Sequence, residues 1–152
     1  MASRSMWSSP TTRTNPTSGS LLLASGATWT DKTGGQDTLK PGEILVVAPY
    51  NAQVAALAKA LPPGARVGTV DKFQGQQAPV VIYSMTTSTP EDAPRGMEFL
   101  YSLNRLNVAT SRAQCVAVIV ASPALFQVDG KTPRQIQLAN ALCRYLEMVS
   151  CN

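Results

Sequence analysis

An arginine at the end of the stretch from Asn104 to Gln114 (NRLNVATSRAQ) is placed where it could bind phosphate. The stretch has helical spacing, with Leu106 and Ala109 on the face expected to be buried. Arg112 ends this pattern and precedes an apolar run, Cys115 to Ala121, which we interpret as a buried strand. A guanidinium fixed at such a junction can hold phosphate oxygens at two points. The alternative is that Arg112 only neutralises the helix C-terminus, and on this stretch alone that alternative is favoured.

A second stretch, Asp71 to Gln77 (DKFQGQQ), carries groups that suit nucleotides. Gly75 allows a positive φ or a close approach of backbone to a ligand. The glutamines provide donors and acceptors for sugar hydroxyls and phosphate oxygens. The alternative is a plain connection between strands, in which Asp71 makes a local turn bond.

The elements that must position these groups alternate between apolar strands and helices. We expect a hairpin from Ala27 to Leu39, which turns at Gly34-Gly35. The predicted strands are Ile44 to Ala48, Arg66 to Val70, Val80 to Met85 and Cys115 to Ala121. The predicted helices are Gln53 to Leu61, one that runs through Thr110, and Arg134 to Val149, with Thr132 as N-cap and Pro133 at the first helical position.

This order predicts an α/β domain with a mostly parallel sheet. Ligands of such sheets bind beyond the carboxyl ends of the strands. We therefore expect three polar loops to lie together there: Pro49 to Gln53, Asp71 to Gln77, and the loop from Thr86 onward.

Composition narrows the classes of function. The 152 residues carry a net charge of +4, which suits a polyanionic partner without requiring one. No histidine is present, which excludes histidine metal ligands and histidine general bases. The three cysteines form no CxxC pair, and no apolar run reaches the ~20 residues that span a bilayer. We expect no membrane association and a reduced, cytoplasmic protein.

The first 26 residues are rich in Ser, Thr and Pro and contain no acidic residue. They cannot bury enough apolar surface to order themselves, so we predict a flexible, disordered tail or a segment introduced by cloning. Residues 27–152 are expected to form the folded domain.

Three motifs give the chain a specific resemblance. TVDKFQGQQAPVV resembles motif V of superfamily 1 helicases, RLNVATSRA resembles motif VI, and VVAPYNAQV resembles motif IV, in the expected order. The chain looks most similar to bacterial RecB-like nuclease-helicase fusions and to the RNA-surveillance and replication branch. The resemblance implies the second RecA-like motor domain, a three-layer α/β fold.

The resemblance also implies roles for individual residues. Arg112 would be the arginine finger that reaches the γ-phosphate of ATP, and Gly75 would bring its backbone near that phosphate. Gln77 stands where the family has a glutamate on the ribose. Tyr50 and Gln53 would lie near the nucleotide, and Thr69, helped by Lys72, would contact a nucleic-acid phosphate. We interpret Arg105 as structural, although it could contact phosphate.

The chain also departs from a complete motor. It contains no GxxxxGK[ST] segment and no acidic Walker B strand, the features that hold phosphate and Mg²⁺ in P-loop enzymes. Val54 stands where some relatives have an arginine. ATP and Mg²⁺ would therefore be held mainly by an N-terminal RecA-like partner domain, and we expect this chain alone to be inactive. We expect the nucleic-acid partner to be single-stranded DNA.

The rival hypothesis is a stand-alone, non-catalytic nucleic-acid-binding or scaffolding module. The two hypotheses place Arg112 differently. A finger would have no carboxylate partner in its own domain, whereas a structural arginine would cap its helix or pair with an acid such as Asp92 or Glu98.

Overall fold

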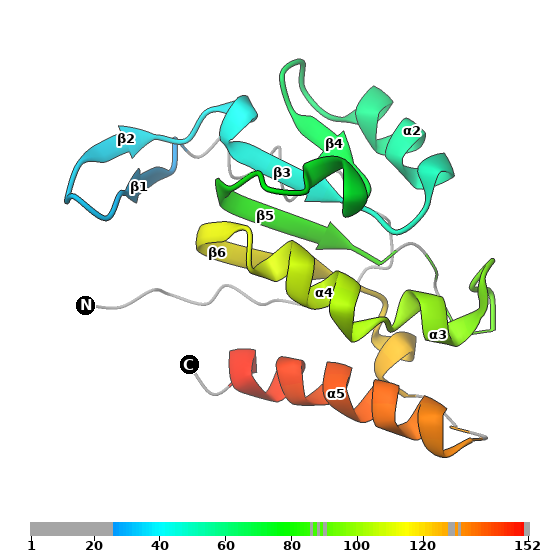
Figure 1. Ribbon diagram of the computed structural model, residues 1–152. Helices are drawn as coiled ribbons and strands as arrows, with labels where there is room; N and C mark the ends of the chain where they lie inside the picture. Colours follow the sequence, from blue (N-terminus) through cyan, green and yellow to red (C-terminus); the bar gives the residue numbers. More distant parts are fainter. Residues whose placement is uncertain are drawn as a thin grey trace.

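A four-stranded, fully parallel sheet forms the centre of the domain (Figure 1). The computed structural model describes residues 26–150, except 86, 88, 90, 128, 129 and 131, so the predicted tail lies outside the described residues apart from Gly26. The strands are β3 (Ile44–Val47), β4 (Arg66–Gly68), β5 (Ala78–Ser84) and β6 (Ala113–Val120), in the spatial order β4-β3-β5-β6. The predicted parallel α/β sheet is confirmed.

The predicted N-terminal hairpin is also confirmed. It pairs β1 (Thr28–Thr30) with β2 (Gln36–Thr38) in antiparallel register, with Trp29 opposite Asp37. Gly34 adopts a φ of 88°, which a side chain would disfavour. The Asp31 carboxylate closes the turn, because it accepts hydrogen bonds from the hydroxyl and amide of Thr33 and from the amide of Gly35.

Helices cover both faces of the sheet and make the three layers of the predicted fold (Figure 1). One face packs against α2 (Asn51–Ala60) through Val46, Val67 and Ile82. The other face packs against α4 (Leu103–Thr110) and α5 (Pro133–Ser150). Shorter helices connect these elements: η1 (Pro41–Glu43), η2 (Asp71–Phe73), α3 (Gly96–Leu100) and η3 (Pro123–Phe126).

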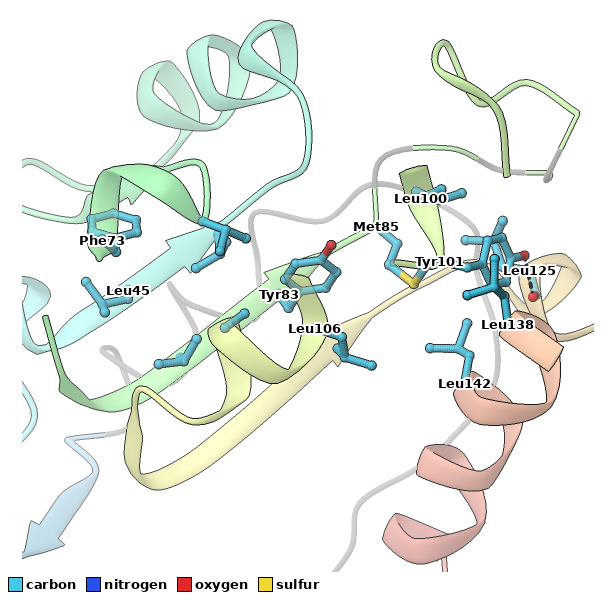
Figure 2. Close-up of a cluster of buried hydrophobic side chains, with 14 of the residues drawn as sticks. Leu45, Phe73, Tyr83, Met85, Leu100, Tyr101, Leu106, Leu125, Leu138 and Leu142 are labelled. Atoms are coloured by element: carbon cyan, nitrogen blue, oxygen red, sulfur yellow. Dashed lines mark hydrogen bonds between the residues drawn. The ribbon is translucent and has the colours of Figure 1, made fainter. Parts of the chain in front are cut away.

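The larger core lies on the face covered by α4 and α5 (Figure 2). Leu106 and Ala109 of α4 are 8% and 0% exposed, as their helical spacing predicts. Phe73 of η2 joins the same cluster at 3% exposed, so the loop that contains it is anchored to the sheet. At the other end of the cluster the Tyr101 hydroxyl donates a 2.6 Å hydrogen bond to the carbonyl of Leu125 (Figure 2).

The C-terminal helix begins as predicted. The Thr132 hydroxyl accepts a hydrogen bond from the amide of Gln135, and Pro133 occupies the first helical position. Leu138 and Leu142 then contribute the buried face. In the part of the chain that the structure describes, every helix is too short or too polar to cross a membrane.

The prediction that Cys115 to Ala121 forms a buried strand is wrong in its burial. The strand β6 exists, but it is the edge of the sheet, and its residues Gln114, Cys115 and Val116 are exposed. Val116 alone is 50% exposed. A continuous apolar run indicates a strand that can be covered on both faces, whereas its place in the sheet depends on chain topology.

Candidate nucleotide and nucleic-acid sites

The predicted site residues fall into two groups at opposite ends of the sheet. Parallel strands carry their amino ends along one edge and their carboxyl ends along the other. The strand β5 has 7 residues, so the two ends are separated by about 20 Å at ~3.3 Å per residue. Arg112, Gly75 and Gln77 lie at the amino ends of β5 and β6, while Tyr50 and Thr69 follow the carboxyl ends of β3 and β4.

The expectation that all three polar loops lie at the carboxyl ends is therefore wrong for one of them. The segment Asp71 to Gln77 starts at the carboxyl end of β4 and reaches the amino end of β5, where the Ala78 amide donates to the Arg112 carbonyl at 3.1 Å. Because β4 and β5 both run parallel to β3, the chain must pass from the carboxyl end of β4 back to the amino-end edge of the sheet before β5 can begin.

Arg112 directly precedes β6 and connects this strand to η2 and α4. Its Nε donates to the Phe73 carbonyl of η2 at 2.8 Å, and its Nη1 donates to the Val108 carbonyl of α4 at 2.9 Å. The side chain is half-buried, and no carboxylate pairs with it among the described residues. The bond to the Val108 carbonyl, in the last turn of α4, is the helix-capping role considered from the sequence. Together the two bonds fix the guanidinium in one orientation and use only two of its five N–H donors.

Gly75 and Gln77 lie between Phe73 and Ala78, the two residues whose backbones bond Arg112, and both are exposed. Gly75 has a φ of 77°, and a Cβ added there would meet nothing within 4 Å. A side chain at this position is therefore disfavoured by the backbone conformation rather than by space, and the open backbone can be approached by a ligand. Gln77 directly precedes β5.

Tyr50 and Thr69 line a cavity of about 240 Å³, which we call the carboxyl-end cavity. Tyr50 precedes α2, and its ring stacks on Phe99 with a centroid distance of 5.3 Å. Gln53, in the first turn of α2, donates from Nε2 to the Ser84 hydroxyl at 2.8 Å. Gln53 is thus placed near the carboxyl end of β5, away from Arg112.

Lys72 does not join Thr69 in this cavity. Its Nζ donates to the Val67 carbonyl at 2.9 Å, and its side chain lines a different cavity of about 730 Å³ beside β4. Arg66 shares that cavity, where its Nη2 donates to the Gln76 side-chain oxygen. The backbone amide of Lys72 donates to the Thr69 carbonyl at 3.1 Å, but the two side chains predicted to contact one nucleic-acid phosphate line different cavities.

Sequence reasoning missed part of the carboxyl-end cavity. Arg95 and Phe99 line it, and so does Arg105, which was interpreted as structural. The Arg95 guanidinium lies 4.9 Å and that of Arg105 4.2 Å from the centroid of the Phe99 ring. The four-residue spacing of Arg95 and Phe99 was a signal of a shared helical face. Only the fold could bring Arg105 to the same ring.

Two tyrosine hydroxyls are buried near this cavity. Neither the Tyr50 nor the Tyr83 hydroxyl has a hydrogen-bond partner within the described residues. Burial raises the pKa of Tyr83 to about 12, opposed by the positive charge of Arg105. Burial also raises the pKa of Tyr50, opposed by the nearby backbone amide of Arg95 and by the charges of Arg95 and Arg105. That amide lies close enough to act on Tyr50 but does not form a hydrogen bond with it.

No group of three or more Cys, Asp and Glu residues that could hold a metal ion occurs in the described ranges.

A parallel four-stranded sheet with helices on both faces and a small antiparallel hairpin beside it is consistent with a RecA-like α/β fold. Comparison with known families gives the assignment. A family model described as an AAA domain matches residues 27–124, and the chain belongs to this family as a superfamily 1 helicase C-terminal region.

Several helicases of known sequence are similar to this chain. A Gallus gallus protein named as the helicase MOV-10 is 32% identical over 62% of the chain and 12% of its own length. The RNA helicase armi of Drosophila melanogaster is 33% identical over 57% of the chain and 8% of its own length. The DNA replication ATP-dependent helicase/nuclease DNA2 of Bos taurus is 37% identical over 49% of the chain and 7% of its own length.

The matched region is thus about a tenth of these relatives or less, and their activities belong to much longer proteins. By name none of the three is a RecB-like fusion, so the narrower resemblance to such fusions stays a prediction.

Proposed function

We propose that this chain is the second RecA-like motor domain of an ATP-dependent helicase, and that it supplies Arg112 to a nucleotide held mainly by a P-loop partner domain. The observation that carries the proposal is the fixed position of Arg112. Its two hydrogen bonds tie α4 to the motif V segment and place the guanidinium at the same end of the sheet as Gly75 and Gln77.

These residues suit a nucleotide. In the described part of the chain no hydrogen bond uses Nη2 of Arg112, so the side chain can stay anchored and still donate to a phosphate oxygen. The open backbone at Gly75 can approach the same phosphate, and the Gln77 amide can bond a ribose hydroxyl.

ATP, when bound, provides a γ-phosphoryl group for transfer to water. The pre-positioned guanidinium of Arg112 would stabilise the negative charge spread over the oxygens of that group in the transition state, without reorganising. Such a finger contributes about 10³–10⁵ in rate in nucleotide hydrolases that use one. Because the chain has no acidic cluster for Mg²⁺ among its described residues, we assign the ion to the partner domain.

We further propose that the carboxyl-end cavity, about 20 Å away, faces the nucleic acid, with Thr69 on a phosphate. Closure of two domains on ATP would then change the contact with the strand and couple hydrolysis to movement. Our expectation from the sequence is single-stranded DNA, but the relatives' names include both an RNA helicase and a DNA helicase. Binding of single-stranded DNA and of single-stranded RNA should therefore be compared.

The test uses the complete protein that contains the P-loop domain. Arg112→Ala and Arg112→Lys should lower kcat for nucleic-acid-stimulated ATP hydrolysis by orders of magnitude and leave the KM for ATP nearly unchanged. Arg134→Ala, on the exposed start of α5, is the control and should retain normal kcat. A normal kcat in folded Arg112 variants would reject the finger role and show that Arg112 is a structural arginine.

A further inference from the structure

The carboxyl-end cavity is lined by two arginines, and neither forms an ion pair within the described residues. Arg95, at the start of α3, and Arg105, on α4, both lie against the ring of Phe99 at 4.9 Å and 4.2 Å. Within the described residues the one ion pair is Lys40 with Asp37, on and next to the hairpin. Asp71 also lines the cavity but lies beyond ion-pair distance of either arginine.

The ring that gathers the two arginines is itself held in place. Phe99 stacks on Tyr50 at 5.3 Å with an interplanar angle of 28°, and Tyr50 lies in the short connection between β3 and α2. A cation over an aromatic face is attracted by the ring's electron density, and more strongly when water is excluded. The ring therefore offsets part of the repulsion between two guanidinium groups, whose planar donors match phosphate oxygens.

Other polar groups of the cavity can form hydrogen bonds with a ligand. The cavity is also lined by Asn51 and Thr69, which add an amide and a hydroxyl. The hydroxyl of Tyr50, another lining residue, is buried with no hydrogen-bond partner in the described part of the chain. Buried polar atoms without partners are rare in folded proteins and ask for an explanation.

We propose that Arg95 and Arg105, aligned by Phe99, form a binding site for one backbone phosphate of a single-stranded nucleic acid, next to the phosphate contacted by Thr69. The inference rests on the proposed function and adds two binding residues and one positioning residue to it. The phosphate is that of a strand rather than the γ-phosphate of ATP, because Arg112, Gly75 and Gln77 lie at the other end of the sheet.

The test measures binding of a fluorescein-labelled oligothymidylate to the full 152-residue chain by anisotropy, over a range of salt concentrations. The double variant Arg95→Gln/Arg105→Gln should bind at least several-fold more weakly. Its slope of log K against log salt should be shallower by about 0.7, the value for one phosphate of a single strand. The control Arg134→Gln/Arg144→Gln removes the same charge from exposed positions on α5 and should keep the wild-type slope.

Two further variants guard against a folding effect. Arg95→Gln alone changes an exposed residue and should give a weaker loss of affinity with an unchanged melting curve. Phe99→Leu keeps both charges, so it should weaken binding less than the double arginine variant does.

Three results would overturn the proposal. One is no measurable binding by the wild-type chain, and another is an equal loss in the α5 control. The third is an arginine double variant that binds oligothymidylate normally but binds a fluorescent ATP analogue less well, which would assign the site to the nucleotide. A failed strand site leaves the kcat test of Arg112 unaffected, so the two proposals fail separately.

Discussion

Arg112→Ala should destabilise the isolated chain by about 2 kcal/mol. The substitution removes hydrogen bonds of 2.8 Å to the Phe73 carbonyl and 2.9 Å to the Val108 carbonyl. A bond with a charged partner contributes about 1.5–3 kcal/mol, so two would give roughly 3–6 kcal/mol if fully buried. The side chain is only half-buried, which lowers that value.

Neither carbonyl is left without a donor, which lowers the cost again. The Phe73 carbonyl still accepts from the Gln76 amide at 3.0 Å, and the Val108 carbonyl still accepts from the Ser111 hydroxyl at 3.2 Å. The penalty for an unsatisfied buried acceptor therefore does not apply. Arg112→Lys keeps the charge but cannot reach both carbonyls with one ammonium group, so it should lose about half as much.

The assay is urea unfolding followed by circular dichroism, with the free energy of unfolding extrapolated to water. Arg134→Ala is the matched control, because Arg134 is exposed and its side chain bonds Gln137 one turn along α5. This substitution should change stability by less than about 0.5 kcal/mol. An unchanged stability in Arg112→Ala would show that the two bonds contribute nothing. A loss of several kcal/mol would instead indicate a buried structural arginine.

Three further outcomes are expected. The purified chain should not hydrolyse ATP, with or without nucleic acid, because it has no P-loop; turnover free of contaminating ATPase would contradict this. In the complete protein Gln77→Glu should be tolerated and Gln77→Ala should raise the KM for ATP, and unchanged kinetics in the alanine variant would remove Gln77 from the site. Burial raises the pKa values of Tyr83 and Tyr101 to about 12, so the folded chain keeps protons that the unfolded chain loses. Stability should therefore fall as pH rises from about 10 to about 12, and Tyr83→Phe should reduce that fall in urea titrations at high pH without lowering stability at neutral pH, because its hydroxyl has no partner within the described residues.

Much of the fold followed from local patterns in the sequence. Helical and apolar spacing predicted the hairpin, the four strands of the sheet and the helices α2, α4 and α5, with boundaries that moved by a few residues. Thr132 and Pro133 marked the start of α5 correctly, because capping depends on groups only three residues apart.

The exposed edge of β6 and the route of the motif V segment were not predictable in this way. Apolar residues predict a strand, but a strand's neighbours are set by the connections of the whole chain. The same limit separated the side chains of Lys72 and Thr69, since a single turn of 3-10 helix sent the lysine towards Val67 instead.

The sequence by itself determined the chemistry of this protein: an arginine at a helix-to-strand junction, a glycine free to adopt positive φ, and the motifs of a superfamily 1 helicase. Tertiary structure decided which of these groups meet. It tied Arg112 to two backbone carbonyls. It also brought Arg95, Phe99 and Arg105 to one cavity, although no local sequence pattern links the two arginines. The physical reason is range. Backbone propensity and capping act over a few residues, whereas a binding site is made by packing that joins segments far apart in the chain.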